Sequence, residues 1–335
     1  MKKRNLYTIF VLLASVYAAS AQQQPHHTQY MMNPFIINPA VAGIEDYWDL
    51  RLSHRHQWAG LQDAPVTSYL TAQGPLWKSG AAITGDEGGR AHSSAYTAPP
   101  AHPGAGRVLV NDVTGPIRRF AFTANLAHHV RLSERASLSG GLGVGMQTFS
   151  LDGSKLDFAN PGDPSAGNGL GVEKRWKPDV RVGLWFYTAR FFAGVSAANI
   201  IRQDLAFDDN RVITNEKRGR LAPHLFFTAG YRFRLNEDFS LLPSLMFRYV
   251  SPMPLSVDVN ARLQYRDRLW AGLNYRHQEG VAAMLGVYIS PLLNVGYAYD
   301  YTASSLNAVS KGTHELTIGL LLRNRNRDYA PRRSW

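Results

Sequence analysis

Cysteine is absent from the 335-residue sequence. The chain therefore forms no disulfide bond, has no thiolate metal site and offers no cysteine nucleophile. A lipoprotein anchor is excluded as well, because such an anchor needs a cysteine after the leader. The sequence also lacks any run of about 18 uninterrupted apolar residues, the minimum for a helix that crosses a bilayer. A polytopic helical membrane protein is therefore excluded.

The N-terminus carries the three parts of a secretion signal. Residues 2–4 are basic, residues 9–16 form a short apolar run, and Ala19-Ser20-Ala21 is a small-residue cleavage site before Gln22. We therefore expect residues 1–21 to be a signal peptide. An exported chain that is rich in aromatic residues and has no helical spans is either a periplasmic β-protein or an outer-membrane barrel.

The composition is basic and aromatic. The net charge is +11, and the chain contains 7 Trp, 16 Tyr and 15 Phe. We do not expect nucleic-acid binding, because no basic helix or recognised binding module accompanies the charge. The arginines suit a lumen, its rims or contacts with anionic outer-membrane lipid, and the aromatics suit the girdles of a membrane barrel.

Apolar and polar residues alternate throughout the C-terminal third, residues 239–323. Between Val257 and Tyr265 one face is apolar, and the other carries Asp258, Asn260, Arg262 and Gln264. A period of two places these sets on opposite faces of a strand. The pattern recurs in segments of about ten residues, which is typical of a transmembrane β-barrel. We therefore predict an all-β fold, a transmembrane antiparallel barrel of about fourteen strands with a short N-terminal periplasmic segment.

The expected organisation follows from these alternating segments and the breaks between them. Residues 22–47 contain two Asn-Pro steps and predict an ordered periplasmic or plug segment rather than a strand. The barrel is expected over 48–323, with loops at 85–107, 150–177 and 202–222, and the basic tail 324–335 in the periplasm with the N-terminus. The predicted strands are 48–58, 66–76, 104–112, 119–131, 135–148, 178–188, 191–199, 224–235, 239–251, 254–266, 268–277, 280–288, 291–301 and 312–323.

Several short motifs occur in a fixed order between Gln29 and Arg323. They are Asn38-Pro39-Ala40-Val41-Ala42-Gly43, Arg55-His56-Gln57-Trp58-Ala59-Gly60, Asn111-Asp112-Val113-Thr114-Gly115-Pro116, Phe247-Arg248-Tyr249, Asp258-Val259-Asn260, Trp270-Ala271-Gly272 with Tyr275-Arg276, Gly296-Tyr297-Ala298-Tyr299-Asp300-Tyr301 and Gly312-Thr313-His314-Glu315-Leu316. Through them the chain resembles the PorP/SprF-like outer-membrane proteins of the type IX secretion system of Bacteroidetes. The insertion near 85–103, which we expect among the outer loops, and His54 depart from the family pattern. The motif residues that we select as partner-binding candidates are Asn38, Pro39, Gly43, Arg55, Gln57, Trp58, Asp258, Asn260, Arg276, Asp300, His314 and Glu315.

The resemblance implies a non-enzymatic barrel without a cofactor. Such a barrel binds or anchors secreted cargo proteins that carry a C-terminal sorting domain. It also links to periplasmic and outer-membrane subunits of the secretion machinery, and the family is associated with gliding motility. The alternative that the sequence leaves open is a diffusion porin for small solutes.

Other constellations carry less weight. His54 and His56 share a strand face, but no third metal ligand accompanies them. His314 and Glu315 face opposite sides of one strand, so they cannot act together as acid and base. No local motif supports a serine hydrolase in the barrel wall. The inward arginines either make an anion-selective lumen or a site for an acidic segment, or they pair with acidic residues inside a plugged barrel. We favour pairing with Asp179, Asp258, Asp300 and Glu315.

Overall fold

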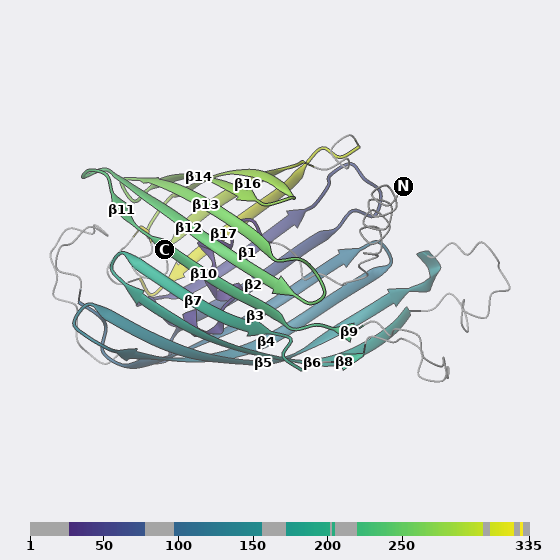
Figure 1. Ribbon diagram of the computed structural model, residues 1–335, viewed down its shortest axis with the longest axis horizontal. Coiled ribbons are helices and arrows are strands. Elements are labelled where there is room, and N and C mark those ends of the chain that lie inside the picture. Colours follow the sequence, from purple (N-terminus) through teal and green to yellow (C-terminus); the bar gives the residue numbers. More distant parts are fainter. Residues whose placement is uncertain are drawn as a thin grey trace, which may run out of the picture.

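The protein is described here by a computed structural model that covers residues 27–77, 97–155, 172–201, 203–204, 220–303, 309–324 and 329–330. Fourteen long antiparallel strands form one closed barrel (Figure 1). Each strand pairs with its neighbour in the sequence, β1 pairs with β17, and the pairing of β10 with β12 completes the ring. Closure leaves no unpaired sheet edge in lipid. The predicted fold class and strand number are confirmed.

The long strands agree with the predicted segments, and three two-residue strands accompany them. β8 and β9 pair with each other inside the expected loop 202–222, and β11 pairs with β12. The strands are β1 Trp48–His56, β2 Val66–Pro75, β3 His102–Thr114, β4 Ile117–Arg131, β5 Ala136–Asp152, β6 Val172–Thr188, β7 Phe191–Ala198, β8 Gln203–Asp204, β9 Arg220–Leu221, β10 His224–Tyr231, β11 Phe233–Arg234, β12 Phe239–Val250, β13 Ser256–Tyr265, β14 Leu269–Arg276, β15 Gly280–Tyr288, β16 Leu293–Thr302 and β17 Thr313–Leu322.

Two strands begin inside segments that we expected to be loops. β3 starts at His102 and β6 at Val172. Pro103 and Gly104 resemble a turn in the sequence. In the structure Gly104 lies in a strand. The residue is a glycine because a Cβ at this position would overlap the carbonyl group of Ala42, which belongs to a segment inside the barrel. This glycine therefore permits a close approach and does not mark a turn.

The two faces of the wall have the predicted chemistry. On β13, Asp258 and Asn260 are buried on the lumen side, whereas Val259 and Leu263 are 47% and 38% exposed on the outer side. The strand pairing preserves this alternation from strand to strand, so the outer surface is apolar and the lumen is polar. Among the described residues no helix is long and apolar enough to cross a membrane.

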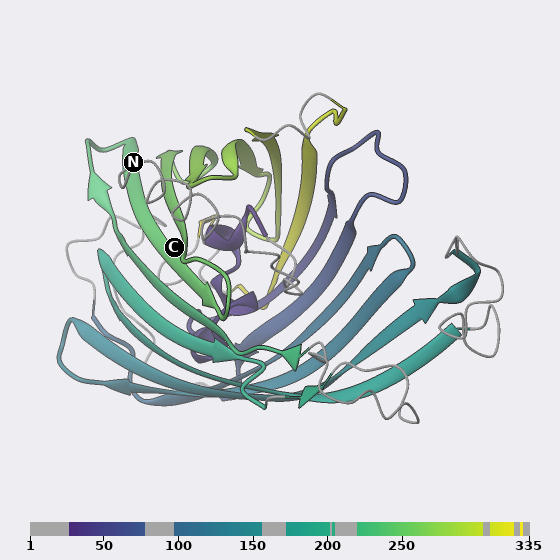
Figure 2. The ribbon, with the colours of Figure 1, turned by 45° about the vertical axis from the view of Figure 1, so that its right-hand side comes forward.

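The barrel has two distinct ends (Figure 2). We call the end at which β1 begins and β17 finishes the tail end, and the opposite one the loop end. β5 ends and β6 begins at the loop end, as do β7 and β10 respectively, and the chain between each of these pairs is long, whereas most strands that meet at the tail end are close in sequence. β2 ends and β3 begins at the tail end. The insertion near 85–103, which we expected among the outer loops, lies mostly outside the described residues, so its place stays a prediction.

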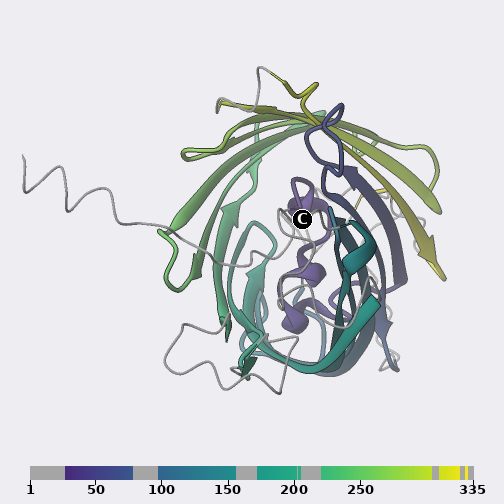
Figure 3. The same ribbon diagram turned by 90° about the vertical axis from the view of Figure 1, so that its right-hand side faces the viewer.

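Residues 27–47, which we call the strap, lie inside the lumen (Figure 3). The strap forms three single-turn 3₁₀ helices, η1 Tyr30–Met32, η2 Pro34–Ile36 and η3 Pro39–Val41. A proline begins η2 and another begins η3. Proline fixes its own φ and disfavours helix at the residue before it, so each Asn-Pro step starts a new short turn.

The strap runs along the lumen from one half of the barrel to the other. Thr28 contacts residues near the loop end, and β1 begins at Trp48 at the tail end. In the C-terminal tail, Tyr329 and Ala330 pack near the tail end beside Trp270. Thr28 and these two tail residues therefore lie toward opposite ends of the barrel. The start of the mature chain, residues 22–26, lies outside the described residues, so its expected place beside the tail stays a prediction. The strap passes through the barrel and does not lie beneath it.

Candidate functional site

A cluster of four residues fastens the beginning of the strap, and we call it the latch: Thr28, Arg55, Asp300 and Glu315. The Arg55 guanidinium donates to Asp300 Oδ2 at 2.7 Å and to Glu315 Oε2 at 3.0 Å. Thr28 joins the cluster through its hydroxyl, which donates to Asp300 at 2.6 Å, and through its backbone N–H, which donates to Glu315 at 2.9 Å. The latch therefore connects the strap to β1, β16 and β17.

The latch pairs its buried charges within the chain, although Arg55 Nε and Asp300 Oδ1 have no hydrogen-bond partner among the described residues. Arg55 and Glu315 are 3% and 0% exposed, and Glu315 also accepts the N–H of Gln29 at 3.2 Å. Charges removed from water need both an opposite charge and further hydrogen bonds. One guanidinium, one hydroxyl and two backbone N–H groups provide them here. The strap thus donates hydrogen bonds to a buried ion cluster of the barrel wall.

Asn38 fastens the middle of the strap. Its side-chain amide donates to the carbonyl oxygens of Leu184 on β6 at 3.0 Å and Val195 on β7 at 3.2 Å. Its side-chain oxygen accepts the N–H of Ala40 at 2.9 Å, so Asn38 also caps η3, in which Pro39 is the first residue. Asn38 therefore couples the Asn-Pro step directly to two strands of the wall.

Gly43 lies where the strap comes close to the wall. Its φ is +79°, a conformation that glycine adopts without strain. Its N–H donates to Gln73 Oε1 at 2.7 Å, and its carbonyl oxygen lies 3.1 Å from His102 Nε2. A Cβ on Gly43 would overlap Gly104, so neither glycine has room for a side chain.

Lumen side chains also donate hydrogen bonds to carbonyl groups of the strap, which need partners because they lie away from water. Ser139 Oγ donates to Ala40 O at 2.7 Å, and Ser196 Oγ donates to Ile37 O at 2.7 Å. His129 Nε2 lies 2.9 Å from Ala42 O. The sequence did not identify these three residues as contacts of the strap.

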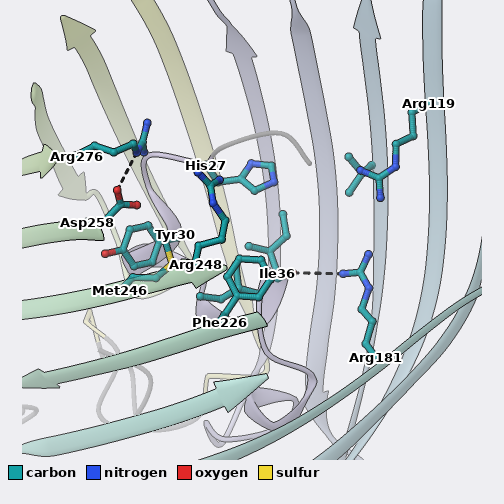
Figure 4. Close-up of a pocket in the computed structure, with 12 residues that line it drawn as sticks. His27, Tyr30, Ile36, Arg119, Arg181, Phe226, Met246, Arg248, Asp258 and Arg276 are labelled. Carbon is teal, nitrogen blue, oxygen red and sulfur yellow. Dashed lines mark hydrogen bonds and ion pairs between the residues drawn. The ribbon is translucent and has the colours of Figure 1, made fainter. Parts of the chain in front are cut away.

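The motif residues Asp258 and Arg276 form a separate cluster, which lines a cavity between the strap and the wall (Figure 4). Arg276 Nε donates to Asp258 Oδ1 at 2.9 Å, and its Nη1 lies 3.3 Å from Glu279. Tyr30 lines the same cavity from the strap. Burial raises the pKa of its hydroxyl, and the Asp258 carboxylate acts in the same direction, so the phenol is neutral.

Four motif residues lie apart from the strap contacts. Asn260 is 1% exposed in the lumen, and its amide has no hydrogen-bond partner among the described residues. Gln57 and Trp58 lie in the connection at the loop end, where the Trp58 N–H donates to the Thr313 hydroxyl at 3.1 Å. His314 lies on the outer face, with its Nδ1 2.6 Å from the Tyr297 hydroxyl.

The expected pairing of lumen arginines with acidic residues is present. Arg181 contacts Asp179 at 2.8 Å, in addition to the pairs of Arg55 and Arg276. Arg51 pairs with Asp49 at 2.9 Å. In the part of the chain that the structure describes, no three His, Asp or Glu side chains are grouped to hold a metal ion.

Comparison with known proteins gives one family and several distant structures. A family model described as "Type IX secretion system membrane protein PorP/SprF" matches residues 19–320. No curated protein sequence matches the chain.

Similar solved structures include the CymD monoaromatic hydrocarbon channel, with a TM-score of 0.43, 12% identity and coverage of 88% of this chain and 92% of that one. The outer membrane protein Omp33 of Acinetobacter baumannii has a TM-score of 0.45 and 8% identity, over 84% of this chain and 100% of that one. The toluene transporter TodX of Pseudomonas putida has a TM-score of 0.44 and 9% identity, over 90% of this chain and 94% of that one.

Proposed function

The chain belongs to the PorP/SprF family of type IX secretion system membrane proteins, and we propose that within that system it is a non-enzymatic barrel that binds or anchors cargo with a C-terminal sorting domain. It is an outer-membrane protein, and its family is one of secretion barrels rather than of enzymes. The proposal adds the cargo and the link to the periplasmic machinery.

The observation that carries this proposal is the fastened strap. The latch, Asn38 and Gly43 attach the strap at three levels of the lumen, and its residues from Thr28 to Glu45 are largely buried. A segment held by a buried ion cluster and by backbone hydrogen bonds on opposite walls favours a rigid scaffold over an open pore. A scaffold presents its rims to partners.

We further propose that the tail end faces the periplasm. Short turns are typical of the periplasmic side of such barrels, and longer loops of the outer side. In this orientation the residues after Leu322 meet the periplasmic machinery, and Gln57 and Trp58 lie at the cargo-facing end. An epitope inserted in the connection 57–65 should then be accessible to antibody on intact cells, and one placed after Arg323 should not.

Deletion of the gene tests the function. Surface proteomics and shaved-cell protease assays should show loss of at least one protein with a C-terminal sorting domain, and a copy of the gene supplied in trans should restore it. If every such protein reaches the surface unchanged in the deletion strain, the proposal is wrong.

The second candidate, a diffusion porin, is favoured by the arginine-lined cavity near the loop end. Planar-bilayer recordings of the purified protein separate the two functions. We expect no steady open-channel conductance from the wild-type barrel. A stable, anion-selective conductance would favour the porin.

A further inference from the structure

The cavity shown in Figure 4 lies between the strap and the wall, in the half of the barrel nearer the loop end. Its volume is about 40 Å³, and Tyr30 and Ile36 line it from the strap. Basic side chains dominate the wall, and two of them enter from each side in the figure. They are Arg119, Arg181, Arg248 and Arg276.

Three of these arginines contact carboxylates of the barrel. Arg276 and Arg181 make close ion pairs, at 2.9 Å and 2.8 Å. Arg248 Nη2 lies 3.6 Å from Glu279 Oε1, a carboxylate that also contacts Arg276. Three of the four guanidinium groups therefore have a carboxylate partner in the wall.

Arg119 is different. It is only 8% exposed, yet among the described residues no carboxylate lies within ion-pair distance of it. Its Nε donates to the amide oxygen of Gln147 at 3.1 Å, and its guanidinium carbon lies 5.9 Å from the centre of the Phe149 ring. Asp112 and Asp179 act on Arg119 only from beyond ion-pair distance, and a buried guanidinium without a close counter-charge destabilises an empty barrel. A negatively charged ligand would relieve that cost.

A second cavity adjoins the first at the loop end, and Arg248 lines both. Its volume is about 190 Å³, and it lies beside the connection between β12 and β13. Its lining includes Val250, Met253 and Leu255, which are apolar. The two cavities together offer a buried positive charge in the lumen and, next to it toward the rim, an apolar surface.

We propose that these adjoining cavities bind an acidic peptide segment, with a carboxylate beside Arg119 and Arg181 and a neighbouring apolar side chain against Met253 and Leu255. This proposal rests on the proposed function in one respect, since a cargo protein would provide the segment. It adds the chemistry of recognition, and the site can exist whether or not the protein serves secretion.

The combination of the two surfaces selects a peptide. An inorganic anion would satisfy Arg119 but would make no use of the apolar rim. Arginine recognises a carboxylate through paired N–H donors, and a ligand that reaches a desolvated guanidinium gains a charge-assisted hydrogen bond. An acidic residue next to an apolar one in an extended chain matches both cavities at once.

The test uses the purified full-length protein in an uncharged detergent and a short fluorescent peptide in which aspartates alternate with leucines. Fluorescence anisotropy should show saturable binding to the wild type. Arg119→Gln should weaken binding at least about tenfold, the loss expected for one charge-assisted hydrogen bond. Arg118→Gln is the matched control, because Arg118 is the adjacent residue but is exposed on the outer face. It should bind as the wild type does.

A second peptide, with every aspartate replaced by asparagine, tests the charge on the wild-type protein alone and does not depend on the folding of a variant. It should bind at least about tenfold more weakly. Acetate and inorganic phosphate should displace the aspartate peptide only at concentrations far above that of the unlabelled peptide.

Several results would overturn the proposal. They are failure of the aspartate peptide to bind, equal binding by Arg119→Gln, equal binding of the asparagine peptide, and displacement by free phosphate or by lipopolysaccharide micelles as readily as by the peptide. If peptide binding depends on Arg119 while the deletion strain secretes all cargo normally, the site stands and the secretion function falls. If the peptide does not bind through Arg119 while the deletion strain loses cargo from the surface, the site is refuted and the secretion function stands.

Discussion

Arg55 and Glu315 are direct partners across the antiparallel pair of β1 and β17, and their side chains meet at 3.0 Å inside the lumen. They are separated by 260 positions in the sequence. The first and last long strands of the barrel therefore meet at an ion pair, and the strap is bonded to that same pair through Thr28. Closure of the barrel and attachment of the strap therefore share one ion pair.

Replacement of Arg55 should loosen the strap and destabilise the barrel. Arg55→Gln leaves the Asp300 and Glu315 carboxylates buried without their counter-charge, at a cost of about 3–5 kcal/mol. Urea unfolding in detergent, followed by the shift of the folded band on unheated gels, measures this cost. Arg266→Gln is the control, because Arg266 pairs with Asp238 at the exposed surface, where such pairs contribute little. Equal unfolding midpoints for the two variants would show that the latch does not stabilise the fold.

A side chain at Gly141 should displace the strap. A Cβ there would overlap the backbone of Ala40, and overpacking of this kind costs about 1–3 kcal/mol. We expect Gly141→Ala to lower the unfolding midpoint and to increase protease cleavage within the strap. Gly140→Ala is the matched control, since its Cβ would meet only Leu184 Cδ2 at an ordinary 3.7 Å. Identical behaviour of the two variants would mean that the strap does not press against β5.

Replacing the side-chain N–H donor of Asn38 by an acceptor should destabilise the barrel more than removing the whole side chain. Asn38→Ala removes hydrogen bonds to two strands and should cost about 1–3 kcal/mol. Asn38→Asp keeps the acceptor for the Ala40 N–H but places carboxylate oxygen against the Leu184 and Val195 carbonyls. It should therefore unfold at a lower urea concentration than Asn38→Ala. The opposite order would show that the cap, and not the link to β6 and β7, is the important contact.

The two faces of β13 should respond differently to substitution. Leu263→Arg places a charge on the lipid-facing side and should reduce folding into lipid vesicles by about 2–4 kcal/mol if the residue lies near mid-bilayer. Asn260→Ala removes a lumen amide that has no partner among the described residues, so assembly should remain intact. Folded fractions in vesicles give the comparison, and equal defects would contradict the assignment of the faces.

Local pattern predicted the wall well, because the direction in which a strand residue points depends only on its parity. The alternation around Asp258 and Asn260 was sufficient to place both in the lumen. Local pattern failed at His102 and Pro103, which the predicted strand 104–112 leaves out but which belong to β3. The cause is a tertiary contact, the close approach of the strap, which leaves no signal in the neighbouring residues.

The sequence predicted several residues of the candidate site, but it did not predict which of them contact one another. Arg55, Asp300 and Glu315 stood out as motif residues, and the structure joins them to Thr28, a residue that has no distinguishing feature in the sequence. His314, one residue from Glu315, lies on the other face beside Tyr297. Motif membership alone therefore does not separate strap contacts from positions on the outer surface.

The sequence by itself determined that this protein is a membrane barrel, because alternation with a period of two and the absence of apolar helical runs are properties of neighbouring residues. It also determined that residues 27–47 would not be a strand, because proline restricts its own backbone and that of the residue before it. Only the tertiary structure decided how the lumen charges are distributed. Pairing depends on which strands closure brings together, and closure joins Arg55 to Glu315 and leaves Arg119 without a carboxylate among the described residues.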